Sequence, residues 1–161
     1  MENQTNDRFE VQLRPELAPP QASQQQVLIR VVAAAIVAAL VGAVGWGLIS
    51  FYSESELGIV AWAIGGLVGV AVAYAAKGQL AQNHLVIAAV LALGGVIGGK
   101  YLDYYLVVRD FEKEYGFSLD GAVSFSDMFG GYDILWIALA VITAWTLPNR
   151  MVGKFVPQHS E

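Results

Sequence analysis

Four long apolar stretches, separated by short polar segments, dominate the 161-residue chain. They cover residues 27–52, 57–76, 85–108 and about 132–147. A helix needs about 20 apolar residues to cross the hydrocarbon core of a bilayer, and only the fourth stretch falls short of that length. The pattern predicts an all-α integral membrane protein whose membrane domain, residues 27–148, is a four-transmembrane-helix antiparallel bundle.

The third stretch has the most unusual pattern and is expected to be the central helix. Its sequence, LVIAAVLALGGVIGGKYLDYYLVV, holds four glycines followed by Lys100 and Asp103. Such a helix is too polar to face lipid on every side, so it must pack against other spans. Apolar residues continue among charges after Val108, which predicts that the helix runs beyond the membrane and ends at Gly116.

Small residues recur at helical spacing in the first three stretches. Because small side chains let two membrane helices approach closely, we interpret them as packing faces rather than as turns, which would need polar neighbours. The residues are Ala35, Ala39, Ala43 and Gly47 in the first stretch, Ala61, Gly65, Gly69 and Ala73 in the second, and Gly94, Gly95, Gly98 and Gly99 in the third.

The segments outside the spans are polar. Residues 1–26 contain acids, three prolines and the tract QASQQQ, which predicts a flexible cytoplasmic tail. Within it, Phe9, Val11 and Leu13 alternate with polar residues, so a strand that docks on a partner is the alternative. Residues 117–131 predict a short interfacial helix or hairpin. Pro148 is expected to end the last span, leaving residues 149–161 as a cytoplasmic C-terminal tail.

The distribution of charge predicts the orientation. One side of the predicted bundle has six of the nine basic residues, and the other has three of them together with nine of the fourteen acids. By the positive-inside rule, both termini are expected in the cytoplasm, with the protein in a bacterial inner membrane. The six basic residues are Arg8, Arg14, Arg30, Lys77, Arg150 and Lys154.

Composition excludes several classes of function. The net charge is −5 and no long Lys/Arg run occurs, which argues against nucleic-acid binding. The chain has no cysteine, and its two histidines, His84 and His159, belong to no metal-binding motif. Neither a nucleophile paired with a base nor a phosphate-binding loop is recognisable. We therefore expect no metal, no cofactor and no catalytic activity.

Three charged residues remain as candidates for a special role: Lys100, Asp103 and Asp133. On a helical wheel Lys100 points away from the four glycines of its stretch, so we expect the glycine face to meet the second span and the lysine face the fourth. Lys100 and Asp133 also lie at about the same predicted depth. We interpret them as a structural ion pair, with Asp103 as a competing acid. A proton or ion site, or snorkelling to the interface, are the alternatives.

The chain resembles small uncharacterised bacterial four-helix inner-membrane proteins. The resemblance rests on Lys100-Tyr101 after a glycine-rich third helix and on the D-x-L-W-x-x-L-A pattern at the start of the last, and it covers about the C-terminal two-thirds. The residues of that pattern are Asp133, Leu135, Trp136, Leu139 and Ala140. The resemblance implies no activity.

Two functional hypotheses follow. The first is a non-catalytic accessory, assembly or scaffold subunit that acts through helix–helix packing, with a membrane protein or a second copy as partner in the bilayer. The second is a small oligomeric carrier or channel that uses Lys100, Asp103 and Asp133. Four helices with few polar residues leave little room for an aqueous path within one chain, which favours the first hypothesis.

Overall fold

A computed structural model describes residues 23–53, 58–117 and 123–155, with side chains up to Met151. Most of the predicted N-terminal tail, residues 54–56 of the first loop and the end of the C-terminal tail lie outside these ranges. The described elements are α2 (Gln24–Ser53), α3 (Gly58–Ala76), α4 (Gln82–Tyr115), the single 3-10 turn η2 (Phe125–Met128) and α5 (Gly131–Phe155). All four α-helices are long and apolar enough to cross a membrane.

Local capping explains where α2 begins and where α4 ends. α2 starts three residues earlier than its apolar stretch, because the Ser23 hydroxyl accepts a hydrogen bond from the Gln26 N–H at 3.3 Å and extends the helix into the glutamine tract. α4 continues to Tyr115, as predicted. Gly116 has φ 71°, a left-handed conformation that glycine adopts freely, and its N–H bonds to the Glu112 carbonyl at 3.0 Å.

The prediction that Pro148 ends the last helix was wrong. α5 continues through this residue to Phe155, and Pro148 is fully buried. Proline removes one backbone hydrogen bond, but a membrane helix tolerates this loss where neighbouring helices and hydroxyl side chains surround the freed groups. The carbonyl that loses its helical donor is that of Ala144, and the nearby Thr146 hydroxyl donates to the Ile142 carbonyl at 2.8 Å instead. The predicted C-terminal tail therefore begins as helix.

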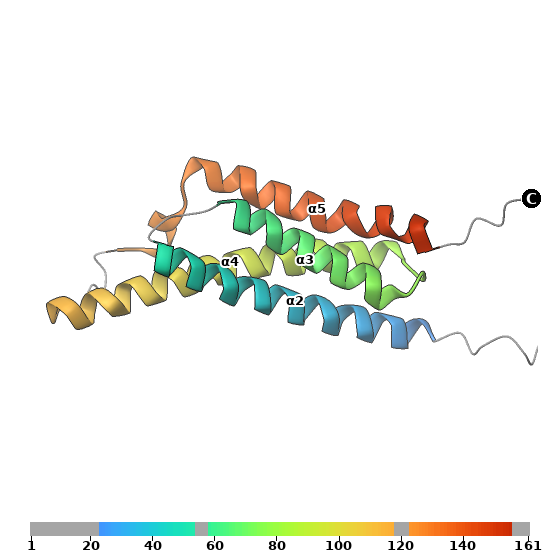
Figure 1. The fold of residues 1–161 in the computed structure, drawn as a ribbon, viewed down its shortest axis with the longest axis horizontal. Coiled ribbons are helices and arrows are strands. Elements are labelled where there is room, and N and C mark those ends of the chain that lie inside the picture. The colour runs from blue at the N-terminus through green and yellow to red at the C-terminus, as the bar shows by residue number, and fades with distance from the viewer. Residues whose placement is uncertain (1–22, 54–57, 118–122, 156–161) are drawn as a thin grey trace, which may run out of the picture.

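The helices form two pairs. α2 packs chiefly against α4, and α3 packs chiefly against α5. Figure 1 shows that the first residues of α2, the connection from α3 to α4 and the end of α5 lie at one end of the bundle, and that α4 extends past the other helices at the opposite end. η2 connects α4 to the start of α5 at that opposite end.

Glycines of α4 face alanines of α2. A Cβ atom added at Gly95 would lie 3.2 Å from the Ala39 carbonyl oxygen, and one at Gly99 would lie 3.3 Å from that of Ala43. Successive contacts advance in the same direction on both helices, so α2 and α4 run parallel. We expected the glycines of the third span to meet the second span. This prediction was wrong, because they meet mainly the first span.

The pairing of α3 with α5 is tighter. A Cβ atom added at Gly65 would overlap the backbone of Ala140, and one at Gly69 would lie 3.4 Å from the Ala144 Cα. Ala140 and Ala144 are fully buried. The second small-residue face therefore packs on the fourth span, again with parallel direction.

Eleven of the twelve small residues selected from sequence lie at least partly in helix contacts. Ten are buried, and Gly98 is half-buried with Ala43 nearby. Gly94 is the exception, because it is exposed and a Cβ added there would meet no atom within 4 Å. Its assignment to a packing face was wrong. Gly94 is adjacent to Gly95 and therefore points about 100° away from the α2 contact.

Ile64 lies where the two pairs meet. This α3 side chain is buried, and it approaches the backbone of both Gly42 on α2 and Gly95 on α4. Most of the remaining apolar interior consists of valines and alanines, including Val31, Val68, Val72 and Val96, with Trp46 and Leu85 as larger buried side chains. Small side chains bring the helix axes close together, and the resulting dispersion contacts hold a bundle that gains little from apolar burial inside a membrane.

Candidate functional site

Lys100 and Asp133 form a buried ion pair between α4 and α5. The Lys100 Nζ lies 2.8 Å from the Asp133 Oδ2, and their side chains are only 3% and 11% exposed. Helical spacing puts Lys100 on the side of α4 away from the glycine contacts, and Asp133 stands in the first turn of α5. The structure brings together the two residues that sequence analysis selected as a pair.

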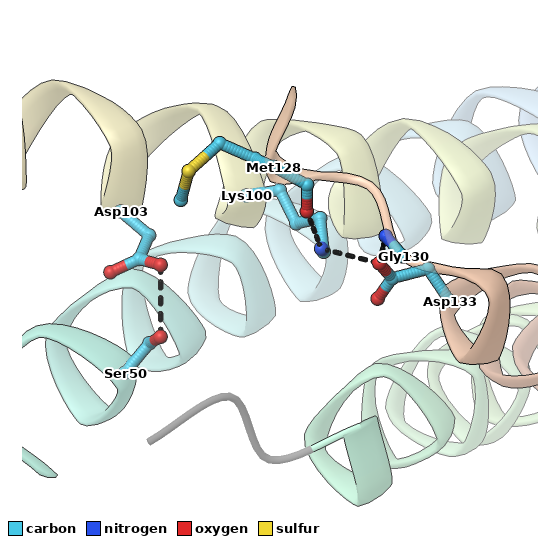
Figure 2. Close-up of polar contacts among 6 residues, drawn as sticks. All are labelled: Ser50, Lys100, Asp103, Met128, Gly130 and Asp133. Carbon is cyan, nitrogen blue, oxygen red and sulfur yellow. Dashed lines mark hydrogen bonds and ion pairs between the residues drawn. The ribbon is translucent and has the colours of Figure 1, made fainter. Parts of the chain in front are cut away.

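Lys100 has two further partners in the segment before α5. Its ammonium group donates to the Met128 carbonyl oxygen at 2.5 Å (Figure 2). It also lies 4.9 Å from the centre of the Phe129 ring. A carboxylate, a carbonyl and an aromatic face therefore surround one cation. Each of these groups stabilises positive charge, which offsets part of the cost of removing the ammonium from water.

Asp133 also caps the helix on which it stands. Its Oδ2 accepts a hydrogen bond from the Gly130 N–H at 2.6 Å, while its own N–H donates to the Gly130 carbonyl at 3.1 Å. This is the carboxylate half of a capping box, and a negative charge is favourable at a helix N-terminus. The same carboxylate thus fixes the start of α5 and binds the cation of α4.

Aromatic contacts hold η2 against α4. The Phe125 ring lies 5.6 Å from that of Tyr101 and 5.9 Å from that of Tyr104, in edge-to-face geometry. The Tyr104 hydroxyl donates to the Val123 carbonyl at 3.0 Å. These contacts fix the segment whose carbonyl at Met128 receives Lys100. A short helix between the third and fourth spans was predicted, and η2 is one helical turn there. Its position at a membrane interface stays a prediction.

Asp103 connects α4 to α2. Its Oδ2 accepts a hydrogen bond from the Ser50 hydroxyl at 2.9 Å, and both residues are buried (Figure 2). Ser50 was not selected from the sequence, so this contact was missed. The available signal was its position, because Ser50 is the one polar residue between Val31 and Phe51.

The polar cluster is therefore Ser50, Lys100, Asp103, Met128, Gly130 and Asp133, and it joins three helices and one loop at the same end of the bundle (Figure 2). Among the described residues, no buried side-chain nitrogen or oxygen lacks a hydrogen-bond partner. The cluster can neutralise charge and fix geometry. It brings no nucleophile together with a base, and its cation is engaged by fixed protein groups.

Comparisons with known proteins found no relative. No family model matches the chain, and searches of curated proteins and of solved structures gave no match. The resemblance stated from sequence stays a prediction, and the function must be argued from the geometry of the bundle.

Proposed function

We propose that this protein is a non-catalytic membrane subunit that assembles with other membrane proteins, or with a second copy, through its helices. The observation that carries the proposal is that the buried charged residues already have partners within the chain. Lys100 contacts Asp133, the Met128 carbonyl and the Phe129 ring, so its charge holds α4, α5 and the intervening loop together.

The outer face of α5 supports an assembly role. Of the 18 most apolar consecutive residues of α5, only 17% are buried within the chain, which is the lowest share among the four spans. Leu135 and Ile142 are each more than half exposed, and Leu139 lies between them on the same face. An apolar face of this kind suits either lipid or a partner helix, because packing rather than hydrophobic burial decides association in membranes.

Bulky substitutions on this face test the proposal. The full-length protein is solubilised from membranes in mild detergent, and the mass of its complex is measured. We expect the wild type to migrate above monomer mass, and Leu135→Trp or Ile142→Trp to lower that mass. Val41→Trp, on the exposed face of α2, is the matched control and keeps the complex. A strictly monomeric wild type in every mild detergent contradicts the proposal.

The carrier or channel hypothesis is the weaker candidate. Three acidic or basic residues do lie in the apolar bundle, which is unusual for a purely structural protein. A conducting path would, however, have to break the contacts that surround Lys100. Flux in liposomes decides between the two. If ion or proton flux appears and Lys100→Ala abolishes it, the carrier hypothesis replaces the assembly proposal.

We also propose an antiparallel arrangement across a bacterial inner membrane, with both chain ends in the cytoplasm. Arg30, Lys77 and Arg150 belong to the end of the bundle where α2 starts and α5 ends, which fits the positive-inside rule (Figure 1). The chain lacks cysteine, so single cysteines report sidedness directly. An impermeant maleimide added to intact cells should label Glu114→Cys and spare Gln79→Cys. The reverse pattern contradicts the orientation.

A further inference from the structure

A titratable side chain fixes the start of α4. The Ala81 N–H donates to the His84 Nδ1 at 3.1 Å, and the His84 N–H donates to the Ala81 carbonyl at 3.0 Å. In a capping box, the side chain of the third helical residue accepts the N–H of the residue that caps the helix, and glutamate or glutamine usually supplies this acceptor. Here the acceptor is an imidazole nitrogen, which can accept only while it carries no proton.

The position of the His84 ring favours its neutral form. The residue is only 4% exposed, and it stands in the first turn of α4, where the helix dipole adds positive potential. It precedes the apolar stretch 85–108. Burial removes water from the ring and so lowers the pKa of His84 from its ordinary value of 6.5.

No described acid faces this ring from the elements around it. The described parts of α2 and α3, the connection between α3 and α4, and α4 as far as Lys100 contain no aspartate or glutamate. Among the residues with described side chains, the charged ones at this end are the exposed cations Arg30, Lys77 and Arg150. A protonated His84 would therefore have no counter-ion there, and its charge would add to three others of the same sign.

The connection from α3 to α4 is strained at its beginning. Lys77 has φ 45° and Gly78 has φ 82°, so two successive residues adopt the left-handed conformation. Glycine adopts it freely, whereas lysine does so only where the surrounding structure holds it. At the other end of the connection Ala81 is exposed, and a cavity of about 450 Å³ opens beside the ring of His84. Water can thus reach the Ala81 N–H, and the ring has space to move.

We propose that His84 is a pH switch whose protonation opens the connection between α3 and α4. A proton on Nδ1 makes this atom a donor that faces the N–H of Ala81, so the hydrogen bond is lost and the two groups repel each other. The imidazolium moves from its buried position toward the cavity, water accepts the Ala81 N–H, and the turn at Lys77 relaxes.

The switch acts on the link between the two helix pairs. The connection joins the α3–α5 pair to the α2–α4 pair at this end, while Lys100 and Asp133 join the pairs at the opposite end. Acid therefore loosens one link and leaves the other intact. This effect does not depend on whether the bundle assembles with a partner.

The sign of the pH dependence follows from the neutral ring. A group whose pKa is lowered in the closed structure stabilises that structure at high pH. The stabilisation by His84 is fully present above its ordinary pKa of 6.5 and is lost as the pH falls toward the lower pKa of the closed state.

Amide hydrogen exchange of the full chain in mild detergent measures the opening. The exchange rate of the Ala81 amide is resolved by NMR at about pH 7.5 and about pH 5.5 and corrected for the intrinsic pH dependence of exchange. An open connection exposes an imidazole with a pKa of about 6.5, so its protonation should raise the opening equilibrium by up to about tenfold between these two pH values.

His84→Gln is the matched variant, because glutamine keeps a neutral acceptor at the same position of the capping box and does not titrate. We expect its Ala81 amide to be equally protected at both pH values. His159→Gln removes the other histidine of the chain and should keep the response of the wild type. The proposal is overturned if acid leaves the wild-type Ala81 amide equally protected, if His84→Gln responds as strongly as the wild type, or if His159→Gln abolishes the response.

Discussion

Both helix pairs pack through glycines and alanines, but their backbones approach one another to different distances. In α2 and α4, a Cβ atom added at Gly95 or Gly99 would come no nearer than 3.1 Å to another atom. In α3 and α5, a Cβ atom at Gly65 would fall on the Ala140 backbone. In the first pair an added atom meets side chains, such as that of Leu102 at 2.8 Å from a Cβ added at Gly47, or lies at distances that a small shift can absorb. In the second pair Gly69 has similar space, but Gly65 leaves none because the added atom falls on backbone.

The polar groups are distributed in the opposite way. The looser pair has the buried Ser50–Asp103 hydrogen bond. The tighter pair has the hydrogen bond from the Trp62 Nε1 to the Thr143 hydroxyl at 2.9 Å, which lies on an exposed face. Lys100 and Asp133 then join one pair to the other. Close backbone contact and a buried hydrogen bond are thus alternative ways of fixing two membrane helices.

The largest effect should come from breaking the link between the pairs. Lys100→Leu leaves the Asp133 carboxylate buried without its cation, which we expect to lower the free energy of unfolding by about 3–5 kcal/mol. Asp133→Leu should have a similar effect, and the double variant should lose less than the two single losses added. A double-mutant cycle of unfolding in detergent micelles measures this. Additivity within about 0.3 kcal/mol would show that the side chains do not interact.

Gly65→Ala should break the tighter pair. The added methyl group meets the backbone of Ala140, which cannot move aside like a flexible side chain, so we expect a loss of about 3 kcal/mol in unfolding free energy. Gly66→Ala is the control on the next residue, where the new Cβ meets nothing within 4 Å. Equal effects of the two substitutions would contradict the close approach of α3 and α5.

Gly95→Ala should lower the unfolding free energy less than Gly65→Ala does. The nearest contacts of the new Cβ are 3.1–3.3 Å, so a small shift accommodates it and the loss should be about 1 kcal/mol. Gly94→Ala, at an open position of the same helix, should instead raise the unfolding free energy by about 0.5–1 kcal/mol. The same unfolding titration compares both. A destabilising Gly94→Ala would place that residue in a contact.

The smallest effect is expected at the hydrogen bond inside the looser pair. Ser50→Ala removes the donor to Asp103, and interhelical hydrogen bonds in membranes contribute about 0.6 kcal/mol on average. Asp103→Asn, which keeps an acceptor oxygen, should also cost less than Asp133→Asn. Unfolding free energies of the four proteins, wild type included, give the order. A larger loss at Asp103 than at Asp133 would reverse the assigned importance of the two acids.

Sequence reasoning predicted most of what depends on one helix alone, although Pro148 does not end α5 as expected. The apolar lengths defined the four helices, Gly116 marked the end of α4, and equal depth suggested the contact of Lys100 with Asp133. The partners of each face were harder to predict. A helical wheel gives the direction of Gly95 within α4, but parallel pairing of non-consecutive helices decides that α2 lies there. The Met128 carbonyl could not be found either, because every residue has one and only the folded loop selects it.

The ion pair also has a consequence for how the chain enters the membrane. α5 is the least hydrophobic of the four spans, with a mean hydropathy of 1.4 in its most apolar window against 2.0 or more in the others, and Asp133 opposes its insertion. Lys100 is synthesised earlier and can neutralise that acid when α5 arrives. We therefore expect insertion of the last segment to depend on the third, and a translocon insertion assay on the full chain should show fewer inserted α5 segments for Lys100→Leu than for the wild type.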